Sequence, residues 1–220
     1  MKIFLGTAVM AAGAIVGTAS AQNLLLNGDF ESVVAKPAGS EPEDWVVDPF
    51  ASSATEPARS GTWSLGQRPT TVAGSIASQG DPFLPGVTFS VSEGDPIRFR
   101  VFAQTLSSDT INRTGHVATA ELFFYDSMGL LTGVAVATAF DGTADPALNP
   151  EDEWVLVAIN TLAPAGSVGM GVALVLEANA QSLGEGAVYW DDASLRIIPA
   201  PGAAALLAFG VAAGARRRRR

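Results

Sequence analysis

Residues 154–176 read Trp154-Val-Leu-Val-Ala-Ile-Asn-Thr-Leu162, then Ala163-Pro-Ala-Gly166, then Ser167-Val-Gly-Met-Gly-Val-Ala-Leu-Val-Leu176. The segments 154–162 and 168–176 are apolar runs of the length of a β-strand, and the Pro- and Gly-containing segment between them is typical of a turn. This stretch therefore predicts two consecutive strands, and it indicates that the domain around it is built from strands.

Strand-like runs recur along the rest of the chain. Residues 87–91 and 96–105 alternate between apolar and polar side chains, and 187–197 is a further strong candidate. No window shows a sustained apolar period of 3.6, and no repeat of fixed length is present. Short strands with Gly/Pro turns predict an all-β fold, an antiparallel β-sandwich. Residues 35–61 read as loop around a short ordered segment at 45–47, and the other candidate strands are 23–26, 63–68, 72–78, 117–125 and 130–140.

Both ends of the chain carry signals rather than parts of the fold. Lys2, an apolar run at 3–16 and the small residues Ala19-Ser20-Ala21 predict a signal peptide over residues 1–21. At the other end, a Pro/Gly segment precedes thirteen small or apolar residues at 203–215 and five arginines. A hydrophobic run stopped by arginines predicts a short helix that enters the membrane with its charged end on the cytoplasmic side. We therefore expect the chain to be exported.

The apolar run in the tail is short for a permanent membrane anchor. Thirteen residues of helix cover about 20 Å, whereas the hydrocarbon core of a bilayer is about 30 Å thick. This length favours transient insertion followed by processing, with a lasting anchor as the alternative.

The domain between the two ends, residues 22–198, is strongly acidic. It holds all 22 acidic residues and only seven basic ones, a net charge near −15, which argues against binding to nucleic acid. The chain has no cysteine and one histidine, so thiol catalysis and cysteine- or histidine-based metal sites are disfavoured. We expect a hydrophobic core to hold the domain together.

Several fragments, in order, resemble carbohydrate-binding-module-like, galactose-binding-type jelly-roll domains. They are Asn23-Leu-Leu-Leu-Asn-Gly-Asp-Phe-Glu31, Glu43-Asp-Trp45, Arg59-Ser-Gly-Thr-Trp-Ser-Leu65, Tyr125-Asp-Ser-Met-Gly129 and Val188-Tyr-Trp-Asp-Asp-Ala-Ser-Leu195. The resemblance implies a jelly roll that binds polysaccharide. It also implies a structural calcium ion held by Glu31 or Asp29, by the loop near Ser60, and by Asp192. The alternative to a calcium site, taken from the residues alone, is that Asp29 is a turn residue and that Asp191 is an acid on a strand that faces solvent.

The tail is similar to a second family, the PEP-CTERM sorting signals that an exosortase recognises. Ala200 stands where these signals usually have Glu, but the three-part layout of proline motif, hydrophobic segment and arginine cluster is kept. The resemblance implies an exosortase-type enzyme as a partner, acting on residues 199–220. The sorting residues are Pro199, Pro201, Gly202, Arg216, Arg217, Arg218, Arg219 and Arg220.

Candidate sugar-binding aromatic residues are those whose side chains are expected outside the core. Phe83 lies in a Pro/Gly loop, and Tyr189 is opposite in phase to Trp190, so we expect both to be exposed, whereas Trp63 and Trp190 should be buried.

No nucleophile elbow, phosphate-binding Gly loop or histidine pair is present, and the acidic run 151–153 reads as a solvated loop. The sequence thus predicts an exported, non-catalytic polysaccharide-binding protein; the alternatives are a purely structural envelope component and a glycan-active enzyme.

Overall fold

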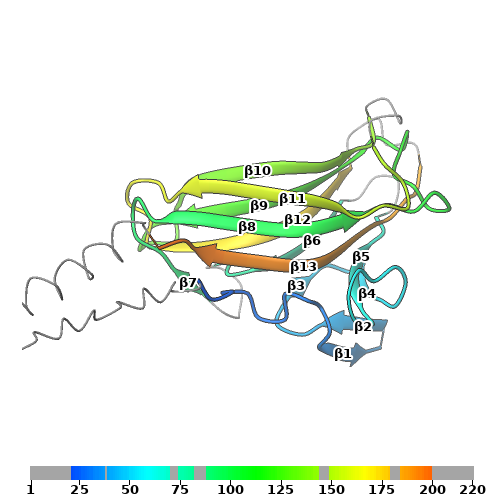
Figure 1. Ribbon diagram of the computed structural model, residues 1–220, viewed down its shortest axis with the longest axis horizontal. Helices are drawn as coiled ribbons and strands as arrows, with labels where there is room; N and C mark the ends of the chain where they lie inside the picture. The colour runs from blue at the N-terminus through cyan, green and yellow to red at the C-terminus, as the bar shows by residue number, and fades with distance from the viewer. Residues whose placement is uncertain are drawn as a thin grey trace, which may run out of the picture. The chain divides into compact units, whose positions relative to one another are not determined.

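Two antiparallel sheets packed face to face build the fold (Figure 1). The computed structural model describes residues 21–37, 39–69, 74–81, 88–143, 149–178 and 184–199. The six-stranded sheet has the order β10 (Leu131–Asp141), β9 (His116–Tyr125), β12 (Gly169–Ala178), β6 (Ser75–Gln79) and β3 (Val46–Val47), with β7 (Phe89–Ser90) also paired to β12. The five-stranded sheet has the order β11 (Val155–Leu162), β8 (Pro96–Gln104), β13 (Val188–Ile197), β5 (Ser64–Gln67) and β4 (Ala51–Ala54). A hairpin of β1 (Val33–Lys36) and β2 (Gly39–Pro42) completes the set.

The core lies between the two sheets because each long strand turns alternate side chains inward. In β8 the side chains of Ile97, Phe99 and Val101 are at most 2% exposed, whereas Arg98 and Arg100 point outward. In β9 the inward side chains are Ala118, Ala120, Leu122 and Phe124. This arrangement confirms the predicted all-β, antiparallel sandwich.

The strands of residues 154–176 are confirmed, and they belong to different sheets. β11 pairs with β8 in one sheet, and β12 pairs with β9 and β6 in the other. The Ala163–Gly166 turn therefore carries the chain from one layer to the other. Trp190 is fully buried as expected, whereas Trp63 stays partly exposed.

Residues 35–61, predicted as loop around an ordered segment at 45–47, contain more strand than expected. β1 and β2 form a hairpin whose side chains are exposed or partly exposed except for the buried Pro42, and β4 is an edge strand of small and polar residues that pairs with β5. Strands that bury little side-chain area need no apolar alternation, so their sequence does not show the period of two. β1, β2 and β4 lie near one another at one end of the sandwich (Figure 1).

Several predictions fall on residues that the structure does not describe. The signal peptide before residue 21, Phe83, and the tail from residue 200 onward, with Pro201, Gly202 and the five arginines, lie outside the described residues. Pro199 is the last described residue and is exposed. Among the described residues no helix has the length and apolar character to cross a membrane.

Candidate functional site

The outer face of the six-stranded sheet carries aromatic side chains seated on glycines. Phe123 and Tyr125 of β9 are directly opposite Gly171 and Gly169 of β12. A Cβ atom added at Gly171 would overlap the Phe123 ring, and one at Gly169 would overlap the Tyr125 ring. Glycine in a strand interior allows such close approach, so both rings lie over the neighbouring strand rather than standing free in solvent.

Glu121 continues this row along β9, on the same face as Phe123. Its carboxylate is half-buried, and burial raises its pKa above the usual range for glutamate; the nearby Glu177 carboxylate raises it further. The Thr119 hydroxyl donates a hydrogen bond to Glu121 Oε1 at 3.3 Å, which opposes the rise in the pKa. The site thus combines a ring face with a carboxylate that can accept hydrogen bonds from a ligand, and the buried Thr119 hydroxyl holds this carboxylate.

The neighbouring edge strand β10 widens this surface with apolar side chains. Val134 is paired with Phe123 and Val136 with Glu121, and these valines are 48% and 55% exposed. We call the set Thr119, Glu121, Phe123, Val134 and Val136 the β9 face. Its apolar side chains lie on two paired strands, with Val134 beside Phe123.

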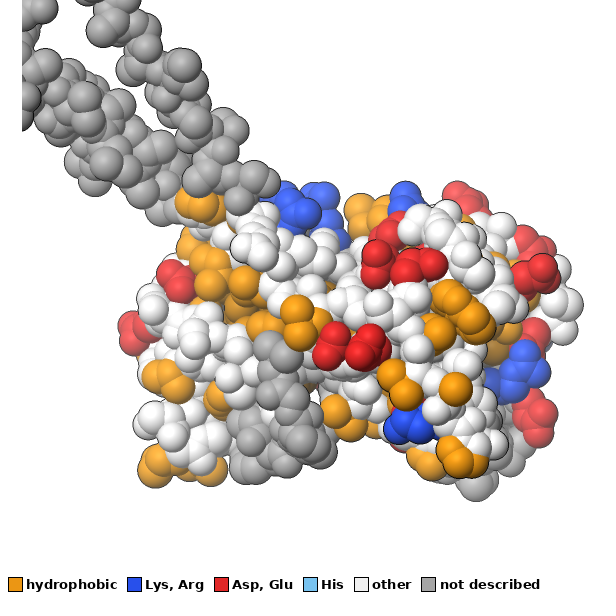
Figure 2. All heavy atoms as spheres, turned by 90° about the horizontal axis from the view of Figure 1, so that it is seen from below, with side chains coloured by type: hydrophobic (Ala, Val, Ile, Leu, Met, Phe, Trp, Pro, Cys, Tyr) orange, Lys and Arg blue, Asp and Glu red, His pale blue; other side chains and the backbone are white. Residues whose placement is uncertain are grey.

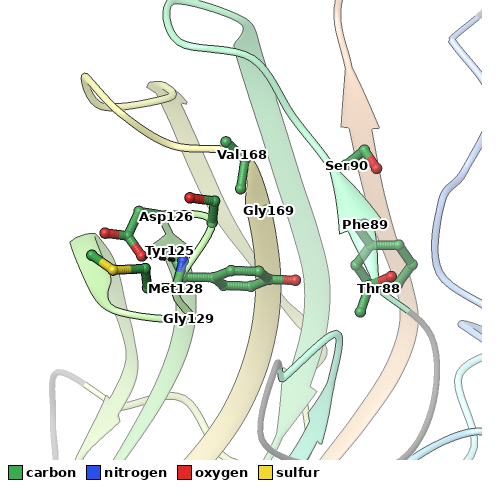
Figure 3. Close-up of a pocket in the computed structure, with 10 residues that line it drawn as sticks. Thr88, Phe89, Ser90, Tyr125, Asp126, Met128, Gly129, Val168 and Gly169 are labelled. Atoms are coloured by element: carbon green, nitrogen blue, oxygen red, sulfur yellow. Dashed lines mark hydrogen bonds between the residues drawn. The ribbon is translucent and has the colours of Figure 1, made fainter.

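A hollow of about 420 Å³ lies at the end of the β9 face, next to the turn between β9 and β10. Figure 3 shows the Tyr125 ring extending from β9 toward Phe89 and Thr88, with Asp126 and Met128 on the turn. The Tyr125 hydroxyl donates a hydrogen bond to the Gly80 carbonyl at 3.2 Å, so burial and this contact fix the ring. Burial also raises the pKa of Tyr125. The remaining lining residues are Ser90, Ser127, Gly129, Val168 and Gly169.

The residues predicted to hold calcium gather around the loop at residues 59–63. Glu31 Oε1 accepts hydrogen bonds from the backbone N–H groups of Thr62 at 2.8 Å and Trp63 at 2.9 Å. The Ser60 hydroxyl donates to Asp192 Oδ1 at 2.8 Å. Asp29 is exposed and lines a polar hollow of about 460 Å³ together with Asp192. The segments that carry the four predicted ligands therefore do converge.

A guanidinium group that the sequence reasoning did not consider lies at the same place. Arg59 forms an ion pair with Asp192 Oδ2, and its guanidinium lies 3.5 Å from the centroid of the Phe102 ring. Carboxylate oxygens such as those of Glu31 and Asp192 suit calcium. In this structure, however, the Arg59 guanidinium already neutralises the Asp192 carboxylate. Among the described residues no group of three or more acidic or histidine side chains is arranged to hold a metal ion.

Asp191, expected to face solvent if it had no role in a site, is fully buried instead. Its Oδ2 accepts the backbone N–H groups of Arg59 at 2.8 Å and Ser60 at 3.1 Å, and its Oδ1 accepts that of Asp192 at 2.7 Å. Burial raises the pKa of Asp191, and the three N–H donors oppose that rise. A register shift in β13 between residues 191 and 194 places Asp191 and Asp192 toward this loop.

The structure corrects the prediction that the Tyr189 side chain is exposed. Tyr189 is 7% exposed because its outward ring packs beside Gly66 and is covered by Arg68, whose guanidinium donates to the Tyr189 hydroxyl at 3.4 Å. Arg68 is held in turn by an ion pair with Asp109. The ring face is therefore closed to a ligand in this structure.

The comparisons with known proteins show the fold. No protein-family model matches the chain, and no curated protein matches it. Among solved structures, a family 16 carbohydrate-binding module is 12% identical, with a TM-score of 0.52 over 79% of this chain and 99% of that module. An arabinose-bound MgGH51 α-L-arabinofuranosidase is 14% identical, with a TM-score of 0.53 over 79% of this chain. The enzymatically active domain of tailspike protein 4 of bacteriophage CBA120 is 13% identical, with a TM-score of 0.52 over 80% of this chain.

The extent of these matches differs. This chain spans 26% of the arabinofuranosidase and 21% of the tailspike chain, whereas it corresponds to nearly the whole carbohydrate-binding module. The domain therefore has a carbohydrate-binding-module-like jelly-roll fold.

Proposed function

We propose that this chain is an exported, non-catalytic protein that binds polysaccharide through the β9 face. The observation that carries the proposal is the seating of Phe123 over Gly171, beside the half-buried Glu121. The jelly-roll fold that the chain shares with a carbohydrate-binding module supports it.

The β9 face has the groups that recognition of a sugar chain needs. A pyranose ring presents an apolar face of C–H groups, which packs on an aromatic ring, and a rim of hydroxyls, which need hydrogen-bond partners. Phe123 and the two valines of β10 supply the apolar floor. Glu121 supplies a hydrogen-bond acceptor at its edge, and the buried Thr119 hydroxyl holds its carboxylate in place. The strand pairing holds these groups in place before a ligand arrives, which limits the entropy lost on binding.

Retention of the full chain on neutral polysaccharides (xylan, galactan, arabinan and cellulose) tests the proposal. We expect retention on at least one polymer, and a loss of affinity of about tenfold for Phe123→Ala, because a buried aromatic contact is often the main anchor of an interface. Phe102→Ala is the matched control, since Phe102 is a partly exposed aromatic residue on the outer face of the other sheet. A folded protein that no polymer retains, or equal retention of both variants, would contradict the proposal.

The same samples separate the two alternative functions. The Glu177 carboxylate is near enough to Glu121 to raise the pKa of Glu121. A glycosidase requires a pair of carboxylates. Release of new reducing ends from a retained polymer would therefore favour the enzyme over the binding protein. A folded chain without retention or hydrolysis would favour a purely structural envelope component.

We also propose export and sorting by an exosortase-type enzyme, on the basis of the two ends of the sequence. Expression of the full chain in a bacterial host with and without an exosortase tests this. We expect removal of residues 1–21, and loss of the arginine-containing tail only where the exosortase is present. A chain that keeps its tail and stays in the membrane fraction in both hosts would support the lasting anchor instead.

A further inference from the structure

Three arginines stand next to one another on the outer face of the five-stranded sheet. Arg98 of β8 and Arg196 of β13 are direct cross-strand partners, and Arg100 lies two residues along β8, opposite Ser194. The inward residues between them, Phe99 and Leu195, are in the core, so the three arginines share the outer face. We call Arg98, Arg100 and Arg196 the arginine row.

None of these arginines forms an ion pair within the described part of the chain. The ion pairs found there join Lys36 to Glu41, Arg59 to Asp192 and Arg68 to Asp109. Arg98 Nε donates a hydrogen bond to Asn160 Oδ1 at 3.1 Å, which leaves its charge uncompensated. Arg196 borders the polar hollow that Asp29 and Asp192 also line, without an ion pair to either.

This grouping is unfavourable for the isolated sheet. Like charges directly opposite each other on neighbouring strands destabilise the pair. The domain has 22 acidic residues and seven basic ones, so ample carboxylates exist to neutralise the arginines. Acidic side chains are spread over the underside of the domain seen in Figure 2. On the strands β11 and β13 that flank β8, the outward residues next to the row are Ala158, Asn160, Leu162 and Ser194, none of them acidic. An anionic ligand would relieve the repulsion.

We propose that the arginine row binds an anionic polysaccharide, one that carries carboxylate or sulfate groups along its chain. A guanidinium group presents paired N–H donors that match a carboxylate or sulfate in geometry. Neighbouring strands are about 4.8 Å apart and alternate residues of one strand about 6.6 Å apart, so the row offers several donors along a narrow track. Asn160 adds an amide, and the exposed Leu162 and Leu156 add apolar contact for sugar rings.

The arginine row is narrow, which favours a single anionic strand over a membrane surface. Recognition of anionic lipid headgroups uses clusters of about four to eight basic residues, and a broad bilayer would also face acidic side chains elsewhere on the domain, which has 22 acidic residues. A polysaccharide strand is narrow enough to touch the row alone. The proposal extends the proposed function to a second face and a second class of ligand, and the two can fail separately.

Binding of the full chain to polygalacturonate in low-salt, calcium-free buffer tests the proposal. We expect retention that disappears as salt is raised, since exposed charges are screened. The double variant Arg98→Gln/Arg196→Gln should bind about tenfold or more weakly, because hydrogen bonds to charged groups contribute strongly. Its thermal midpoint should equal or exceed that of the unchanged protein, which shows that it is folded. Arg113→Gln is the control, because Arg113 is exposed and lies outside the row.

Each other outcome decides against the proposal. Absence of retention, or equal losses for the double variant and Arg113→Gln, would overturn it. Row-dependent binding to vesicles of phosphatidylcholine and phosphatidylglycerol without binding to polygalacturonate would assign the row to a membrane. Row-dependent self-association without polygalacturonate binding would assign it to the acidic surface of a second copy. Phe123→Ala should keep polygalacturonate binding, so loss of neutral-polymer binding alone would affect only the proposed function.

Discussion

Glu121 is the residue on the β9 face whose charge state should be visible in the stability of the protein. Burial raises its pKa in the folded state. Between the ordinary glutamate pKa and this raised pKa, the folded protein therefore keeps a proton that the unfolded chain has released. The charged carboxylate therefore costs stability, and this cost develops as the pH rises from the ordinary glutamate value through the raised pKa. Glu121→Gln should raise the thermal midpoint at pH 7 and leave it nearly unchanged at pH 4. Glu153→Gln, at an exposed loop position, should show no such difference; equal pH profiles for the two variants would contradict the assignment.

Gln67 joins the two sheets by side-chain hydrogen bonds inside the core. Its Oε1 accepts from the Trp190 indole N–H at 2.7 Å, and its Nε2 donates to the Leu174 carbonyl at 2.9 Å on the opposite sheet. Gln67→Met keeps the side-chain volume but leaves these buried groups without partners, which should cost about 1–3 kcal/mol of unfolding free energy. Urea denaturation measures this cost. An unchanged midpoint would show that the bonds contribute nothing net.

Prediction from the sequence at the residue scale was right for Trp190, and it was wrong for Trp63, which is partly exposed, and for the Tyr189 ring. Trp190 was predicted buried from strand alternation, and it is. Tyr189 was predicted exposed by the same alternation, but it is covered by Arg68, which is 121 residues away in the chain. Alternation tells which face a side chain occupies, and it carries no information on what covers that face. Phe123 was missed, although the Gly169-x-Gly171 spacing in a strand was a usable sign of close approach by a neighbouring ring.

At the scale of elements, the glycines of β12 determine whether Phe123 can lie on the sheet. A Cβ at Gly171 would overlap the ring and come within 2.8 Å of the Gly80 carbonyl carbon. Gly171→Ala should therefore lower the unfolding free energy by about 1–3 kcal/mol through overpacking, and it should reduce neutral-polysaccharide retention. Gly66→Ala is the control, because a Cβ there meets atoms no nearer than 3.4 Å. Equal thermal midpoints for the two variants would mean that the sheet absorbs the methyl group without moving the ring.

The elements that the sequence predicted well are those that bury a complete face. β8, β9 and β12 contribute inward side chains along their whole length, so burial leaves a pattern in the sequence. β1, β2 and β4 are held by backbone pairing at the surface and bury few side chains, so burial leaves little pattern in their sequence. Cross-strand groupings such as the arginine row depend on register, which the sequence of a single strand does not contain.

At the scale of the whole molecule, hydrogen bonds join the first segment of the domain to its last strand. The Leu24 N–H donates to the Leu195 carbonyl at 2.8 Å, and the Ala193 N–H donates to the Gly28 carbonyl at 2.6 Å. Asn23 Oδ1 accepts from the Leu195 N–H at 2.8 Å. The jelly-roll resemblance predicted that these ends converge. It did not predict the ion pair between Arg59 and Asp192, because residues that are 133 positions apart in the chain leave no local sequence pattern.

Calcium binding at this junction stays a prediction, and Arg59 makes it a sharp one. A calcium ion bound by Asp192, Glu31 and the Ser60 loop would compete with the guanidinium for the Asp192 carboxylate. If calcium binds, it stabilises the folded chain by mass action, so chelator should lower the thermal midpoint and added calcium should restore it. Arg59→Gln should then increase the calcium-dependent shift, and Asp192→Asn should abolish it. If chelator changes nothing in the unchanged protein or in Arg59→Gln, then Arg59 is itself the cation that closes the junction, and Arg59→Gln should lower the midpoint at every calcium concentration.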